Sequence, residues 1–122
     1  MTPGEQGLTR IISATRYSWQ GLRAAWKHEA AFRQEASLAL IGFPLAYFLA
    51  RDTNDFLLLT LPLLLLMLAE LANSAIEAIV DRLGDEPDEL SGRAKDMGSA
   101  MVFMAIVMAM LSWGTLLGRQ LL

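Results

Sequence analysis

The sequence predicts an all-α membrane protein, with three transmembrane helices and an amino-terminal amphipathic helix on the membrane surface. Three observations support this fold class. Of the 122 residues, 54% are hydrophobic, and they are gathered in blocks too long and too apolar for a soluble domain of this length. A basic amphipathic segment precedes the blocks. Lys and Arg are concentrated in the amino-terminal arm and in one polar connection, as the positive-inside rule requires of a multi-span protein.

Composition also argues against several classes of function. The net charge of −3 argues against a nucleic-acid partner, because proteins that bind nucleic acid usually gather an excess of Lys and Arg. The chain has no cysteine, which excludes disulfides and thiolate metal sites, and the single His28 cannot form a histidine cluster for zinc. We therefore expect any metal ion to be held by oxygen ligands.

The first expected element, over residues 7–28, is the surface helix. Its apolar positions recur at alternating steps of three and four residues, so they share one helical face. The opposite face is basic, and two tryptophans suit the headgroup layer, where anionic lipid attracts each cation by roughly 1 kcal/mol. A soluble helix packed on a core is the alternative. The repeating positions are Leu8, Ile11, Ile12, Thr15, Trp19, Leu22 and Trp26.

Three apolar blocks follow the surface helix. The first, over 36–50, is shorter than a hydrocarbon core of about 30 Å requires, so the first span must include neighbouring residues. Pro44 and Pro62 lie inside the first two spans, where prolines are expected to kink a helix without ending it. The expected spans are 30–51, 56–83 and 96–118, with a polar connection over 84–95.

The distribution of cations predicts the orientation of these spans. Five Lys or Arg residues lie in the amino-terminal arm, and Arg82, Arg93 and Lys95 lie at the second connection. Only Arg51 and Arg119 lie on the other side. The positive-inside rule therefore places the amino terminus and the second connection in the cytoplasm.

The second span carries a polar face that points to a functional site. A carboxylate near the middle of a spanning helix costs about 2.5 to 3.5 kcal/mol on insertion, so two of them in one segment need a compensating role. At about 100° per residue, five polar residues share one narrow helical face. Hydrogen bonding between helices is an equally open role for the amide and the hydroxyl. The face consists of Glu70, Asn73, Ser74, Glu77 and Asp81.

The predicted topology brings further charged residues to the same cytoplasmic interface: Glu29, Glu35, Arg93, Lys95 and Asp96. Carboxylates beside cations suit a magnesium–nucleotide complex, because Mg²⁺ takes one or two carboxylates plus phosphate oxygens and Lys or Arg holds the remaining phosphate charge. The deepest carboxylate is the best general base, since partial removal from water favours proton uptake.

Other interpretations of these carboxylates remain open from spacing alone. The chain has neither a P-loop nor the motifs of protein kinases, so the familiar nucleotide-binding folds are excluded. A carboxylate inside a small membrane protein is more often a proton- or cation-coupling group, or a packing contact. A small proton-coupled transporter that uses Glu70 as its titrating group is therefore the alternative from another class.

Three sets of motifs identify a family. Residues 70–82 read Glu-Leu-Ala-Asn-Ser-Ala-Ile-Glu-Ala-Ile-Val-Asp-Arg, and residues 89–100 read Glu-Leu-Ser-Gly-Arg-Ala-Lys-Asp-Met-Gly-Ser-Ala. The arm adds Arg10-Ile-Ile, Tyr17-Ser-Trp and Gly-Leu-Arg-Ala-Ala-Trp26. These motifs closely resemble the small integral-membrane diacylglycerol kinases of bacteria, and the resemblance covers almost the whole chain.

The resemblance implies a homotrimer of three-span subunits in the bacterial cytoplasmic (inner) membrane. Such an enzyme transfers the γ-phosphate of ATP directly to the free hydroxyl of diacylglycerol and gives phosphatidic acid, in active sites shared between subunits. Glu70 matches the proposed base, and Glu29 and Glu77 match the residues that hold Mg²⁺. The undecaprenol kinases share the carboxylate and Lys-Asp core, and they are the alternative within the same class.

The resemblance also assigns residues to the two substrates. Pro87 removes a backbone donor between Glu86 and Asp88, so the nucleotide contacts of this stretch are the least fixed. The implied nucleotide side comprises Arg10, Tyr17, Glu29, Glu77, Glu86, Asp88, Lys95 and Asp96. The implied lipid side comprises Ala14, Arg23, Trp26, Ala31, Glu35 and Ser99. Asn73, Asp81 and Arg93 are expected to support the site.

Overall fold

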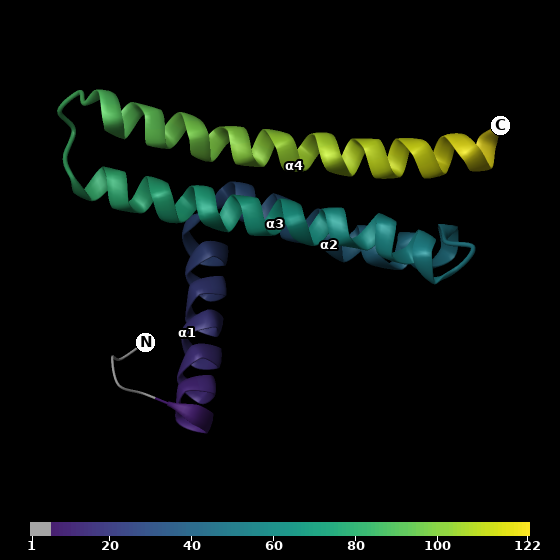
Figure 1. The fold of residues 1–122 in the computed structure, drawn as a ribbon, viewed down its shortest axis with the longest axis horizontal. Coiled ribbons are helices and arrows are strands. Elements are labelled where there is room, and N and C mark those ends of the chain that lie inside the picture. The colour runs from purple at the N-terminus through teal and green to yellow at the C-terminus, as the bar shows by residue number, and fades with distance from the viewer. Residues whose placement is uncertain (1–5) are drawn as a thin grey trace.

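The computed structural model describes residues 6–122, and within this range the chain forms four α-helices and no strand. The predicted all-α class is confirmed. Figure 1 shows three helices lying side by side along the long axis, while the first helix projects away from them, crosswise to that axis. The helices are α1 (Gly7–His28), α2 (Ala30–Leu49), α3 (Thr53–Arg82) and α4 (Glu89–Leu121).

The third helix, α3, is the centre of the structure and packs on α2 and on α4. Two hydrogen bonds join the helices at the end where α2 turns into α3. The indole Nε1 of Trp113 donates to the carbonyl oxygen of Leu59 at 2.9 Å, and Nε2 of Gln120 donates to that of Leu49 at 2.6 Å. Two small apolar clusters complete the packing: Ala46, Leu59 and Leu116 near this end, and Leu66, Ala69 and Ala105 further along.

Two of the helices, α3 and α4, are long and apolar enough to cross a membrane. The helix α2 has 20 residues, and its first two turns carry Arg33, Gln34 and Glu35, so only its later part is apolar. Large apolar side chains such as Leu40, Phe48 and Met110 are exposed on the outer surface. An apolar surface of this extent suits lipid or further helices better than water.

Two helices begin earlier than the sequence predicts, because aspartates cap them. In α4 the Asp88 carboxylate accepts a hydrogen bond from a first-turn backbone N–H at 3.0 Å, so the helix starts at Glu89. The polar connection is therefore shorter than the predicted 84–95, and Lys95 lies on the second turn of α4. The helix α3 starts at Thr53 for the same reason, since the Asp52 carboxylate accepts from the Asp55 N–H at 2.9 Å.

The helix α1 is joined to the bundle at its carboxyl end. The Arg33 guanidinium donates to the carbonyl oxygens of Trp26 at 2.7 Å and Lys27 at 3.2 Å, and it thereby satisfies acceptors that the end of α1 leaves free. The predicted apolar stripe of α1 is exposed, with Trp19 at 62%. Among residues 6–122 no other helix covers that stripe, so its apolar face is available to a membrane.

Candidate active site

The polar face of α3 lies at the level of the junction between α1 and α2. Glu70 and Asn73 are buried, with 6% and 8% of their surfaces exposed. Glu70 is close enough for its charge to interact with Glu77 on the same helix and with Glu29 at the junction, and Glu35 of α2 interacts with Glu70. The fold therefore brings three other carboxylates, from α2, from α3 and from the α1–α2 junction, within electrostatic range of Glu70.

Asn73 connects this cluster with the fourth helix. Its side-chain Nδ2 donates to Oε1 of Glu77 at 3.3 Å. Its Oδ1 is buried without a hydrogen-bond partner among the described residues and faces Gly98 of α4. Asn73 thus orients a carboxylate of the site and also contacts the neighbouring helix, so the two roles left open by the sequence coincide in one side chain.

An ion pair ties the start of α4 to the end of α3. Nζ of Lys95 lies 2.8 Å from Oδ1 of Asp81, and the Lys95 charge also interacts with Glu77 and Asp85. Both partners are exposed, with 46% and 66% of their side-chain surfaces accessible. The pair therefore places a cation beside the carboxylate cluster where a ligand from solution can reach it.

A hollow of about 690 Å³ separates α1 from α3. Glu29 and Ser74 contribute its polar walls, and His28 lies at its edge together with apolar side chains such as Leu71 and Ala75. Glu29 is a member of the carboxylate cluster, and Ser74 lies one turn from Glu70 on α3, so this hollow adjoins the cluster.

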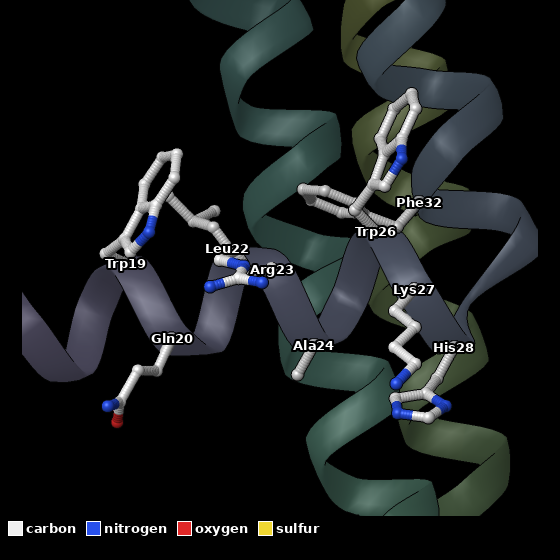
Figure 2. A pocket seen from close by; sticks show the side chains of 9 residues that line it. All are labelled: Trp19, Gln20, Leu22, Arg23, Ala24, Trp26, Lys27, His28 and Phe32. Atoms are coloured by element: carbon white, nitrogen blue, oxygen red, sulfur yellow. The ribbon is translucent and has the colours of Figure 1, made fainter.

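A second hollow, of about 680 Å³, lies along α1 and is drawn in Figure 2. The side chains of Trp19, Trp26 and Phe32 point to one side of the helix, whereas those of Lys27 and His28 point to the other. Such a groove has an apolar wall and a polar rim. It is suited to a molecule with an acyl part and a polar head.

Several predicted residues on α1 lie apart from the cluster. Figure 1 shows that the amino-terminal half of α1, which carries Arg10, Ala14 and Tyr17, extends away from the other helices. The Tyr17 ring instead contacts the neighbouring Arg16 guanidinium, whose carbon lies 5.2 Å from the ring centroid. Within one chain these residues are not brought to the carboxylates. The exposed members of the predicted site are Arg10, Tyr17, Arg23, Trp26, Ala31, Asp81, Glu86, Asp88, Arg93, Lys95, Asp96 and Ser99.

A preassembled metal centre is absent from residues 6–122, where no three His, Cys, Asp or Glu side chains are placed to hold one ion. The donor set still fits a hard cation. Glu29, Glu70 and Glu77 carry like charges that interact in partly buried surroundings, and a divalent ion with oxygen preference would offset their repulsion. The other ligands would have to come from phosphate oxygens or water.

Two residues of the site were not singled out from the sequence. Arg33 was expected only as one of the cations that set topology and as part of the family motif over residues 29–35, with no role in the site, yet it joins α1 to α2 next to Glu29. Gly98 had no assigned role, although it faces Asn73. A sequence pattern could have indicated neither contact, because each depends on how one helix is placed against another.

Comparison with known proteins agrees with the motifs of the chain. The family described as prokaryotic diacylglycerol kinase matches residues 16–117. The chain is 53% identical to a diacylglycerol kinase of Escherichia coli over 117 residues, which are 96% of each chain. It is 50% identical to that of Haemophilus influenzae over 111 residues, covering 91% of this chain and 94% of the relative. Identity to the Pseudomonas aeruginosa enzyme is 45% over 114 residues, or 93% of each chain.

Proposed function

This chain belongs to the prokaryotic diacylglycerol kinase family and phosphorylates diacylglycerol as a bacterial membrane enzyme, and we propose that the reaction is a direct, Mg²⁺-assisted transfer from ATP. The γ-phosphoryl group passes to the free lipid hydroxyl and gives phosphatidic acid and ADP. The observation that carries this mechanism is the carboxylate cluster of Glu29, Glu70 and Glu77 beside the Lys95–Asp81 ion pair.

Glu70 is the residue we assign as general base. It is the most buried of the carboxylates in the cluster and lies near the hollow between α1 and α3. A carboxylate that is shielded from water can accept the proton of the lipid hydroxyl as that oxygen attacks the γ-phosphorus and the bond to the ADP oxygen breaks. No phosphorylated enzyme intermediate is required.

Glu29 and Glu77 are the residues we assign to Mg²⁺. They come from the α1–α2 junction and from α3, so together they can offer carboxylate oxygens from two sides. The bound ion would neutralise phosphate charge, and the Lys95 ammonium contributes in the same way. Asn73 keeps Glu77 oriented through its amide hydrogen bond. Asp96 and the connection with Glu86 and Asp88 complete the nucleotide side of the proposal.

The lipid side of the proposal uses the groove along α1. Trp26 and Arg23 line this groove, and its apolar wall can hold acyl chains while the polar rim meets the glycerol head. Glu35 is half-buried on α2, one turn after the groove residue Phe32, and lies within electrostatic range of Glu70. Ala14, Ala31 and Ser99 are further proposed lipid contacts.

We further propose three spans per subunit, a cytoplasmic amino terminus, and a homotrimer in the inner membrane with shared active sites. The cation distribution supports the orientation. The exposed apolar surface of α4 supports contact with other helices. Sharing of sites would also bring the amino-terminal half of α1, with Arg10 and Tyr17, to the carboxylates of a neighbouring subunit, which one chain by itself does not do.

Phosphate transfer in mixed micelles tests the mechanism. Purified protein would receive γ-labelled ATP with Mg²⁺ and either diacylglycerol or undecaprenol, and a parallel sample would contain a chelator. We expect label in phosphatidic acid only when both diacylglycerol and Mg²⁺ are present. Equal labelling with the chelator would contradict the role of the metal. Labelling of undecaprenol alone would reassign the substrate.

A further inference from the structure

Gly98 of α4 lies opposite the polar face of α3, and we propose that it is a positioning residue that allows Asn73 to hold Glu77 ready for Mg²⁺. Gly98 is itself buried, and Asn73 faces it across the contact between the two helices. The inference rests on the proposed function, because it assumes that Glu77 is a ligand of the metal–nucleotide complex. The inference adds Gly98 to the site as a residue that contacts neither substrate but sets the position of Glu77, a proposed ligand of the metal–nucleotide complex.

A side chain at position 98 would occupy the space that Asn73 now fills. A Cβ atom there would collide with Oδ1 of Asn73 and would stand 3.4 Å from its Cγ and 3.6 Å from its Cα. The contact therefore involves the amide group and the backbone of Asn73 and not only the end of a flexible chain. Replacement of Gly98 by alanine must displace the Asn73 amide.

The amide has little freedom to move elsewhere. Asn73 is only 8% exposed, and its Oδ1 finds no hydrogen-bond partner among the described residues. Because Gly98 has no side chain, Oδ1 of Asn73 lies against the backbone of α4. Weak contacts with Cα–H groups are the interactions that this backbone can offer it. Its Nδ2 donates to Glu77 at 3.3 Å, which is already long for a hydrogen bond. A displaced amide would lose this bond and release Glu77.

Other glycines provide matched controls. Gly92 and Gly114 lie on the same helix, and a Cβ atom at either position would meet nothing. At Gly42 of α2, a Cβ atom would instead press on the side chain of Leu63, far from the carboxylates along the bundle. Gly92→Ala and Gly114→Ala therefore report any general effect of alanine in α4. Gly42→Ala reports the effect of crowding between two helices at a different place.

The test measures binding of a non-hydrolysable ATP analogue with Mg²⁺ to the full-length protein in micelles, together with the thermal unfolding midpoint. Loss of a group that orients a metal ligand typically weakens metal affinity by about 10- to 100-fold, so Gly98→Ala should raise the Kd of the analogue at least about tenfold. Gly92→Ala and Gly114→Ala should leave the Kd unchanged. Gly42→Ala should lower the midpoint without changing the Kd. An unchanged Kd for a folded Gly98→Ala would overturn the inference.

A double-mutant cycle decides whether Gly98 acts through Asn73. Asn73→Ala removes the amide without crowding, so it should raise the Kd by itself, even if Gly98→Ala fails to fold. Adding Gly98→Ala to Asn73→Ala should cause no further loss, whereas independent effects would multiply and overturn the inference. Glu77→Gln distinguishes a failure of the proposed metal role of Glu77 from a failure of the Gly98–Asn73 contact. If it leaves the Kd unchanged, the proposed metal role of Glu77 fails; if it raises the Kd while Asn73→Ala does not, only the role of the Gly98–Asn73 contact fails.

Discussion

Glu70 and Glu77 are two turns apart on α3, but their surroundings differ. Glu70 is buried between helices, whereas Glu77 is half-buried, accepts a hydrogen bond from Asn73 and lies within range of Lys95. A ligand of a metal–nucleotide complex must be reachable from solution and held in one orientation, whereas a general base for a lipid hydroxyl must lie where the lipid can reach it and water is largely excluded. The different surroundings of the two carboxylates therefore fit the two proposed roles.

We expect Glu70→Gln to abolish turnover while it leaves nucleotide binding intact. Glutamine keeps the size and the polarity of the side chain but cannot accept the hydroxyl proton, and loss of a general base typically costs about 10²- to 10⁴-fold in rate. Turnover in micelles and the Kd of the Mg²⁺-bound ATP analogue would be measured on the same preparation. A rise in Kd as large as that of Glu77→Gln would contradict the division of roles.

Lys95→Met should weaken nucleotide binding without destabilising the protein. The Lys95–Asp81 pair is exposed, and exposed ion pairs contribute little to folding, so the unfolding midpoint should stay within error. Loss of the ammonium leaves phosphate charge unbalanced, and we expect the KM for ATP to rise at least about tenfold, as a charged contact to phosphate implies. Arg119→Met, at the other end of α4, is the control and should change neither quantity. An unchanged KM in Lys95→Met would remove Lys95 from the nucleotide side.

The four helices could be predicted from the sequence because the signals that define them are local. Apolar periodicity predicts the surface helix and the apolar blocks predict the three spans, and aspartates at positions 52 and 88 were available as cap signals for the earlier starts of α3 and α4. What one sequence does not contain is the placement of one helix against another. The Asn73–Gly98 contact and the Arg33 hydrogen bonds depend on that placement, so the sequence singles out the candidate carboxylates and Asn73 but not Gly98 or Arg33 as residues that position them.

Arg33→Gln should loosen the junction between α1 and α2. The variant loses two charged hydrogen bonds to carbonyl oxygens of the last turn of α1, beside Glu29. Glu29 N–H donates to the Ala25 carbonyl at 2.9 Å, so its amide reports the opening of this turn. We expect its hydrogen exchange to quicken about tenfold, equivalent to about 1.4 kcal/mol for the lost bonds. Arg51→Gln, at the opposite end of α2, should leave this exchange unchanged, and equal acceleration in both variants would contradict the local explanation.

The bundle as a whole is polarised along its axis. Carboxylates, Lys95 and the polar connection lie at one end, while the other end is closed by apolar contacts and by the hydrogen bonds of Trp113 and Gln120. The helix α1 leaves the bundle near the polar end, with its tryptophans on one side and Lys27 and His28 on the other (Figure 2). In a bilayer this arrangement would place α1 at one interface, with the carboxylate cluster just beneath it. The proposed trimer has no comparable signal within one chain, and it remains a proposal that rests on the family resemblance.

The orientation of this axis can be tested by labelling, because the sequence contains no cysteine and single thiols can be introduced freely. Thr53→Cys marks the connection between α2 and α3, and Asp85→Cys marks the connection between α3 and α4. Since the cations lie mainly in the arm and at the second connection, the positive-inside rule places Asp85 in the cytoplasm and Thr53 outside. In intact spheroplasts a membrane-impermeant thiol reagent should therefore label Thr53→Cys at once and Asp85→Cys only after permeabilisation.

Gln6→Cys should behave like Asp85→Cys, because an odd number of spans separates each of them from Thr53. Labelling of Gln6→Cys in intact spheroplasts together with Thr53→Cys would mean that α2 does not cross the membrane, and the three-span topology would be wrong.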